Sequence, residues 1–151
     1  MTRGDDVAVD AGSWAAAVAN SGGNPLNDYD VMAPACPSRS VLRHVVDRWT
    51  PLVVSALEGG SLRFGDLKNR VGGVSPKVLT HTLRSMERDG LVSRHHTPTM
   101  PPRVDYSLTP LGRSLTVPMQ ALRTWAQDNA GSVLAARHAY DQAAINTEQG
   151  E

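Results

Sequence analysis

The chain has 151 residues, in which 15 Lys and Arg are balanced by 15 Asp and Glu, and it contains one cysteine. One cysteine excludes a disulfide framework within the chain, and no apolar run is long enough to span a membrane. The length suits one domain with flanking tails. Because no basic-then-apolar signal opens the sequence, we expect a cytoplasmic protein.

The zero net charge hides an uneven distribution of charged residues. Residues 1–35 carry one basic and five acidic residues, residues 36–108 carry eleven and six, and residues 109–151 carry three and four. The three parts therefore have net charges of −4, +5 and −1. A cationic middle between acidic flanks is typical of a nucleic-acid-binding module.

Residues 1–35 predict an N-terminal arm with little regular structure. Ser13 to Ala19 could form a short helix, which the run from Ser21 to Pro25 would end. Two interpretations stay open. The arm is either partly disordered, or it packs across a partner subunit with Trp14 as its anchor.

Two short helices should follow the arm. The first begins at Pro37 and runs to about Val46, and the second begins at Thr50-Pro51 and ends at Gly59. In the second helix Thr50 is expected to cap and Pro51 to occupy the first turn. Its inward-facing residues are expected to be Leu52, Val53, Ala56 and Leu57. Residues 61–63 are expected to form a short extended link.

The next two helices form a helix-turn-helix. Residues 64–71 form its first helix, Gly72-Gly73 its turn, and residues 75–90 its second helix, with Ser75 as cap, Pro76 in the first turn and Gly90 as stop. Apolar residues at helical spacing, Leu79, Leu83 and Met86, form one stripe. The other side carries Lys77, Thr80, His81, Arg84 and Arg88. Such a helix suits the major groove of DNA, although a solvated polar face is the ordinary alternative.

After Gly90 the hydrophobic period changes from about 3.6 to 2. Residues 91–96 and 103–108 alternate as strands, and the proline-rich residues 97–102 form a stiff tip between them. A β-hairpin directly after a helix-turn-helix is a wing. The sequence therefore predicts an α+β, mostly α, winged helix-turn-helix with a two-stranded wing and flanking dimerisation helices.

A further helix should begin at Thr109-Pro110, with Leu111, Leu115, Leu122 and Trp125 at helical spacing and a kink at Pro118. This apolar stripe is longer than a small domain needs, so it either pairs with its copy in a second subunit or packs back on its own chain. Residues 132–145 are expected to form one more helix before a disordered tail.

Motifs from residue 36 onward resemble those of the HxlR-type winged helix-turn-helix transcriptional regulators. They are Cys36-Pro37 through Trp49, LRFGDL at 62–67, VSPKVLT at 74–80, DGLV at 89–92 and PRVDYSLT at 102–109. The resemblance covers about residues 36–128, which we assign as the DNA-binding domain with its dimerisation helices, leaving residues 129–151 as a C-terminal helix and tail. It implies a bacterial regulator that binds operator DNA as a homodimer through its first helix and the helix after the wing. Two departures are Val46-Asp47-Arg48, where Gly-Gly-Lys is usual, and His81, where Gln is common.

We therefore expect a sequence-specific transcriptional regulator that binds an inverted-repeat operator and acts as a repressor. Lys77, Thr80, His81 and Arg84 are the expected base-reading residues. Expected phosphate contacts are Arg63, Lys68, Arg70 and Ser75, and Arg103 is expected to contact the backbone or the minor groove. Arg88 and Arg94 are expected to be ordinary surface charges.

Two sensing hypotheses remain open. Cys36 begins a helix beside Arg39, which favours thiolate, and some HxlR-type relatives use a cysteine at this position to sense oxidants or electrophiles. Alternatively, Cys36 is a small hydrophobe under the dimer seam. The second hypothesis is a small-molecule ligand near the dimer interface, bound by an aromatic wall of Trp14, Trp49, Trp125 and Tyr140.

The sequence does not favour an enzyme, a metal or a cofactor. His95 and His96 are adjacent on a strand and point to opposite faces, and no phosphate loop, nucleophile elbow or HExxH motif is present. A winged helix that binds only protein is the remaining alternative. The cationic helix and wing argue against that alternative.

Overall fold

The computed structural model describes residues 29–148, so the predicted helix at residues 13–19 and the side chain of Trp14 lie outside the described residues. Contacts divide the chain into two units, up to Val117 and from Pro118 onward, and we describe each by itself. The elements are α2 (Pro37–Val45), α3 (Thr50–Leu57), β1 (Leu62–Arg63), α4 (Phe64–Val71), α5 (Pro76–Arg88), β2 (Val92–Thr97), β3 (Arg103–Leu108), α6 (Pro110–Arg113) and α7 (Thr116–Glu148).

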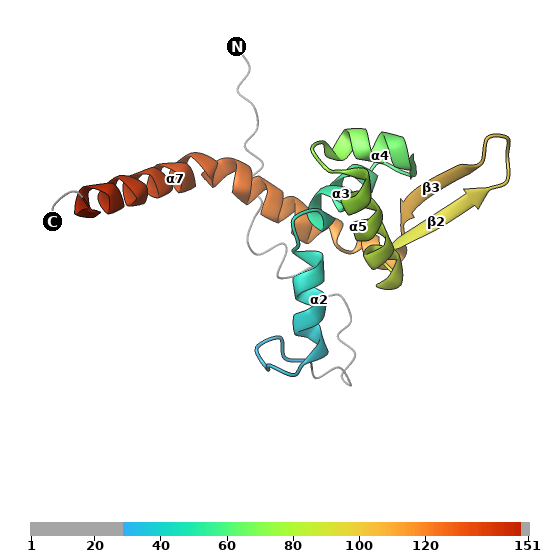
Figure 1. The fold of residues 1–151 in the computed structure, drawn as a ribbon. Helices are drawn as coiled ribbons and strands as arrows, with labels where there is room; N and C mark the ends of the chain where they lie inside the picture. Colours follow the sequence, from blue (N-terminus) through green and yellow to red (C-terminus); the bar gives the residue numbers. More distant parts are fainter. Residues whose placement is uncertain (1–28, 149–151) are drawn as a thin grey trace, which may run out of the picture. The chain divides into compact units, whose positions relative to one another are not determined.

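The first unit is a winged helix-turn-helix, as the sequence predicts (Figure 1). Its core lies where α3, α4 and α5 meet the base of the hairpin. The fully buried side chains are Val53, Val54, Leu67, Leu79, Leu83 and Met86. Burial of each such side chain contributes about 1.5–3 kcal/mol to the stability of the fold. The packed core therefore holds α5 in place and fixes the orientation of its exposed face.

Helix α3 differs from expectation in its cap and in its buried face. Thr50 is itself helical and buried, and Asp47 Oδ1 accepts the backbone N–H groups of Trp49 and Thr50, both at 2.8 Å. The cap is therefore supplied from three residues earlier than predicted. Leu52, predicted to face inward, is 40% exposed, and Val54 is buried in its place.

Helix α2 has no buried residue. A side-chain hydrogen bond joins it to a residue distant in sequence: His44 Nδ1 lies 3.3 Å from Asp89 Oδ2, at the end of α5. Its apolar side chains Val41, Leu42 and Val46 are 60%, 48% and 48% exposed. The helix thus presents an apolar face that the first unit does not cover.

The wing belongs to a three-stranded antiparallel sheet of order β1-β3-β2. Sequence reasoning placed residues 61–63 in an extended link and did not foresee that Leu62 and Arg63 would pair with β3. The first hairpin strand begins at Val92, one residue later than predicted, and the return strand has the predicted bounds. At the tip the Thr99 hydroxyl donates to the Pro101 carbonyl oxygen at 2.9 Å.

The chain leaves the wing through a close contact at Gly112. Thr109 caps α6 by accepting the Gly112 N–H at 3.0 Å, and the Thr109 N–H donates to the Leu91 carbonyl oxygen at 3.1 Å. A Cβ at residue 112 would overlap that same carbonyl oxygen. Glycine is therefore required where the short helix crosses the start of the hairpin.

Three expectations for the C-terminal region are wrong. Pro118 does not kink a helix, because α6 ends at Arg113 and Pro118 lies in the first turn of α7, where a missing N–H is tolerated. Residues 132–145 are not a separate helix, because α7 continues through Gly131 to Glu148. Helix thus extends past residue 146, where a disordered tail was expected.

The second unit consists of α7 from Pro118 onward. Large apolar side chains along it stay exposed: Leu122 at 49%, Trp125 at 60%, Leu134 at 60% and Tyr140 at 77%. Leu122 and Trp125 are three residues apart and share one face of the helix, and an exposed apolar face of this kind is typical of an assembly interface. None of the helices within residues 29–148 has the length and apolar character needed to cross a membrane.

Candidate nucleic-acid interface

Helix α5 is built with one buried and one cationic face. Ser75 Oγ accepts the Val78 N–H at 3.2 Å and closes the N-terminal turn, as predicted. The buried side consists of Leu79, Thr82, Leu83 and Met86. Since residues three and four apart share a face, Lys77, His81 and Arg84 project from the other side, where all three are exposed.

The N-terminal half of α5 borders a surface cavity of about 420 Å³ next to the start of α4. Its lining residues are Phe64, Pro76, Lys77, Thr80, His81 and Arg84. Within it the Thr80 hydroxyl donates to the Pro76 carbonyl oxygen at 2.7 Å. The proton of Thr80 is thereby used inside the helix, so a base can meet only its methyl group or its oxygen lone pairs.

A second cavity, of about 440 Å³, lies between α5 and the hairpin. It is lined by Thr80, Arg84, Glu87, Arg94 and Tyr106. Sequence reasoning treated Arg94 as an ordinary surface charge. The register pairs Arg94 with Tyr106, and this places its guanidinium on the side of the wing that borders Arg84. The alternation of side chains along β2 divides its residues between the two faces of the hairpin. Only the pairing of β2 with β3 shows which of these faces lies toward α5.

A third cavity, also about 440 Å³, lies between the start of α4 and the wing. Its lining includes Arg63, Phe64 and Arg103 together with tip residues 99–102. Phe64 borders the first cavity as well, and Thr80 and Arg84 border both the first and the second. The first hollow therefore adjoins each of the other two, which share no lining residue with one another.

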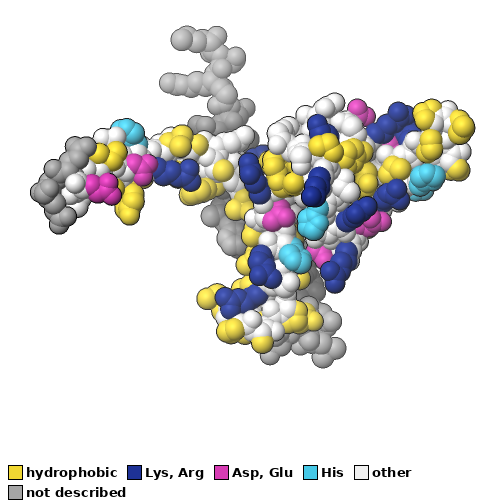
Figure 2. Space-filling model, viewed as in Figure 1, with side chains coloured by type: hydrophobic (Ala, Val, Ile, Leu, Met, Phe, Trp, Pro, Cys, Tyr) yellow, Lys and Arg dark blue, Asp and Glu magenta, His cyan; other side chains and the backbone are white. Residues whose placement is uncertain are grey.

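We call the exposed cationic side chains around these hollows the α5–wing surface: Arg63, Lys77, His81, Arg84, Arg94 and Arg103. Figure 2 shows Lys and Arg side chains gathered over α5 and the wing, with an apolar hairpin tip beyond them. Lys77 and Arg84 line the first hollow, and Arg103 lines the third, which shares Phe64 with the first.

The other predicted phosphate contacts lie apart from these cavities. Lys68 and Arg70 occupy the last turn of α4, before the Gly72-Gly73 turn, where Lys68 is half-buried and Arg70 exposed. Neither lines the three hollows. Both remain near the start of α5 in the chain, and their contact with DNA stays a prediction.

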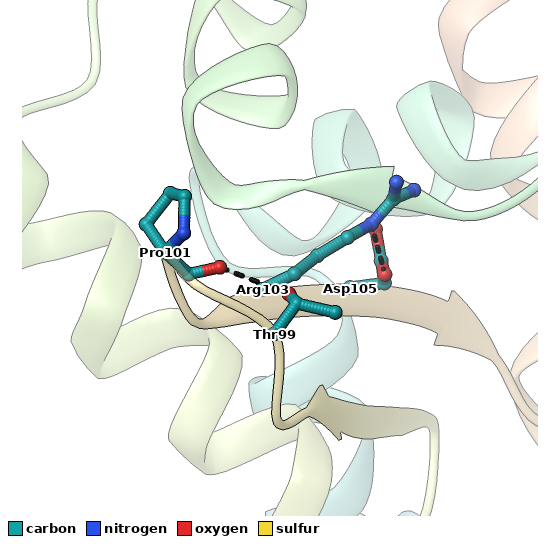
Figure 3. A network of polar contacts seen from close by, with 4 residues as sticks. All are labelled: Thr99, Pro101, Arg103 and Asp105. Atoms are coloured by element: carbon teal, nitrogen blue, oxygen red, sulfur yellow. Dashed lines mark hydrogen bonds and ion pairs between the residues drawn. The ribbon is translucent and has the colours of Figure 1, made fainter.

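One acidic residue lies within the cationic wing. The Arg103 Nε donates to Asp105 Oδ2 at 2.7 Å (Figure 3). This hydrogen bond lowers the pKa of the Asp105 carboxyl, with smaller contributions from the charges of Arg103, Arg63 and His95. The same contact raises the pKa of Arg103. Sequence reasoning did not single out Asp105.

Cys36 lies at the N-terminal cap of α2 and is partly exposed. Its Sγ is 3.1 Å from Ser38 Oγ. Hydrogen bonds from the Ser38 side chain and then from its backbone lower the pKa of the thiol, while burial and the nearby Asp30 carboxylate act in the opposite direction. The sequence hypothesis named the helix start and Arg39 as the cause of thiolate formation and missed Ser38.

The described members of the predicted aromatic wall are spread along the chain. Trp49 is half-buried before α3, with the Arg48 guanidinium carbon 4.9 Å from its ring centroid. Trp125 and Tyr140 are exposed on α7. At 1.5 Å per residue those two lie about 22 Å apart along the helix. One small ligand therefore does not contact both rings of the same chain.

The helix-turn-helix of α4 and α5, followed by a hairpin that joins β1 in one sheet, defines a winged helix-turn-helix protein. The family model for the HxlR-like helix-turn-helix matches residues 44–133. The chain belongs to this family.

Similar proteins are named as transcriptional regulators. The HTH-type transcriptional regulator YtfH of Escherichia coli, itself uncharacterized, is 45% identical over 112 residues, which cover 74% of this chain and 89% of YtfH. The structure of the ytfH regulator of Salmonella typhimurium superposes with a TM-score of 0.68 at 44% identity, covering 74% of this chain and 99% of that one. The redox regulator HypR in its reduced form gives a TM-score of 0.60 at 27% identity, covering 66% and 98%.

Proposed function

We propose that this transcriptional regulator binds an inverted-repeat operator as a homodimer, with one α5 in the major groove of each half-site. The supporting observation is the α5–wing surface, where exposed cations from α5, the β1–α4 junction and the wing border adjoining hollows. The opposite face of α5 is committed to the core. A helix held in this way can enter a groove without loss of its packing.

The contacts divide into those that read bases and those that hold the backbone. Arg84 borders two of the hollows and reaches far enough to form a forked contact with guanine. Lys77 and His81 flank it toward the start of the helix, where groove contact is closest. Arg63, Arg94 and Arg103 line the hollows nearer the wing and are suited to phosphate oxygens.

Two uncovered apolar faces support a dimer. Helix α2 has no buried residue and exposes Val41, Leu42 and Val46, and α7 exposes a stripe that includes Leu122 and Trp125. Large exposed apolar faces on a soluble chain are typical of subunit contacts. A zero net charge removes long-range repulsion between two copies.

Selection from a random duplex pool with the full chain, followed by a salt titration of the selected duplex, tests this function. We expect the selected sequence to be an inverted repeat. Five Lys or Arg side chains lie on the α5–wing surface, so two subunits offer ten. If about half contact phosphates, the logarithm of the binding constant should fall against log salt with a slope of about −4 to −5. Binding that is insensitive to salt, or a selection without repeat symmetry, would contradict the proposal.

A second part of the proposal is that Cys36 makes DNA binding responsive to oxidants or electrophiles. The lowered pKa of its thiol and its partial exposure support this role, as does likeness to HypR, which is named a redox regulator. With one cysteine in each chain, the available products are a Cys36–Cys36 disulfide between subunits, a mixed disulfide or an adduct.

Ser38→Ala should slow alkylation of Cys36 by iodoacetamide at neutral pH, because loss of its largest pKa-lowering contact raises the pKa of the thiol. The rate against pH should show a midpoint displaced to higher pH. Ser40→Ala is the control: this neighbouring serine is not among the groups that shift the pKa of the thiol, so its loss should leave the profile unchanged. Identical profiles for all three proteins would remove Ser38 from the account, and an unchanged reporter response in Cys36→Ser would remove the redox role.

A further inference from the structure

Asp105 is a carboxylate placed in the middle of a cationic surface. It lies on β3, the central strand, directly opposite Arg63 on β1 and His95 on β2. Arg103, two residues earlier on the same strand, shares its face. The Asp105 side chain is only 14% exposed, and Oδ1 is buried with no hydrogen-bond partner among the described residues.

This placement is unfavourable for simple structural reasons. Aspartate is depleted in strands, and burial of a charged carboxylate opposes folding unless a partner compensates. A surface that attracted DNA by charge alone would also bind more tightly without it. Asp105 is therefore unfavourable both for strand formation and for general attraction of DNA to the wing. Its presence points to a specific role beside Arg63 and Arg103.

Its one hydrogen bond fixes how Arg103 is presented. Figure 3 shows the Arg103 side chain running back along β3, with its guanidinium beside Asp105 rather than toward the hairpin tip. Contact is made through Nε, at 2.7 Å from Oδ2. Among residues 29–148 the guanidinium forms no other hydrogen bond, so both Nη groups keep their donors for an acceptor outside the chain.

We propose that Asp105 is a positioning residue for DNA recognition, which holds the Arg103 guanidinium beside Arg63 so that the two cations meet a DNA acceptor in one set geometry. The inference rests on the proposed function and adds the source of its selectivity at the wing. A pre-oriented side chain loses less rotational freedom on binding, and its plane is set before contact. Asp105 thereby exchanges general attraction to DNA for discrimination between sites.

Asp105→Asn separates positioning from simple charge, because the two roles predict opposite outcomes. Asparagine preserves shape and removes one negative charge. Positioning predicts that affinity for the selected operator duplex falls by about threefold per wing, or about tenfold for a dimer. Affinity for a scrambled duplex of the same length should stay equal or rise. An equal rise in affinity for both duplexes would show that Asp105 only reduces the positive charge of the surface, and would overturn the inference.

Asp66→Asn is the matched control. Asp66, in the first turn of α4, also acts on Arg103 through its charge but forms no hydrogen bond with it. This variant should raise binding to both duplexes slightly and keep their ratio. A loss of ratio as large as that of Asp105→Asn would contradict a role carried by the hydrogen bond.

A double-mutant cycle shows whether Asp105 acts through Arg103. In an Arg103→Ala background, Asp105→Asn should cause no further loss of operator affinity. An undiminished tenfold loss there would overturn the inference. Thermal unfolding and the dimer fraction of each variant should match those of the wild type, and Asp105→Glu provides a charged second variant if Asp105→Asn unfolds. If the wild type binds no duplex, the proposed function is wrong. If the wild type binds and Asp105→Asn keeps the same ratio of operator to scrambled-duplex affinity, only the positioning role is wrong.

Discussion

Val41→Asp should convert the proposed dimer into monomers and lower operator affinity by about two orders of magnitude or more. Val41 is 60% exposed and belongs to the uncovered apolar face of α2, a helix with no buried residue. A carboxylate there leaves the isolated subunit unharmed but would be buried without a partner in the dimer. Two linked half-site contacts strengthen binding by about 10²–10⁴ over one, and this gain disappears with the dimer.

Sedimentation or light scattering gives the mass of the variant, and gel-shift titration gives its affinity. Ser40→Asp places the same charge on the polar side of the same helix and should remain dimeric. If Val41→Asp stays dimeric and binds the operator as the wild type does, α2 is not part of the subunit interface.

Arg84→Ala should lower affinity for the operator by about 1–3 kcal/mol per half-site contact. Arg84 and Thr80 are the two side chains of α5 that line both the cavity toward α4 and the cavity toward the wing. A central, exposed guanidinium offers two parallel donors to a guanine edge, and no other side chain type replaces that geometry. Affinity for scrambled duplex should change much less, so the ratio of specific to non-specific binding should fall.

Two arginines provide matched controls for this loss. Arg88→Ala removes the same charge from the same helix at its C-terminal end and should leave the ratio unchanged. Arg63→Ala should weaken binding to every duplex alike and reduce the salt slope by about two, roughly one for each subunit of the dimer, because a phosphate contact carries little sequence information. Equal affinity of Arg84→Ala and wild type for the selected duplex would contradict the assignment of Arg84.

Local signals were sufficient to predict most helices and strands of the first unit. Capping residues followed by proline mark the starts of α5 and α6, and the change of period after Gly90 marks the wing. The errors came where a contact with a residue outside the element determines its structure. Asp47 caps α3 because of how the preceding turn folds, and β1 is a strand only because Tyr106 and Asp105 pair with it.

The site shows the same division. The cationic face of α5 follows from helical period alone, since the positions of Leu79 and Leu83 in the core determine which side Arg84 occupies. Arg94 and Asp105 could not be assigned in this way. Their significance depends on strand register, which places one beside α5 and the other between two cations of neighbouring strands.

In the proposed complex, two copies of the α5–wing surface meet one duplex together. Hydroxyl-radical footprinting of the full chain on the selected duplex tests this arrangement most directly. We expect two symmetric protected segments on one face of the DNA, with centres about one helical turn or a whole multiple of it apart. A single unsymmetric segment, at protein concentrations that saturate the duplex, would contradict it.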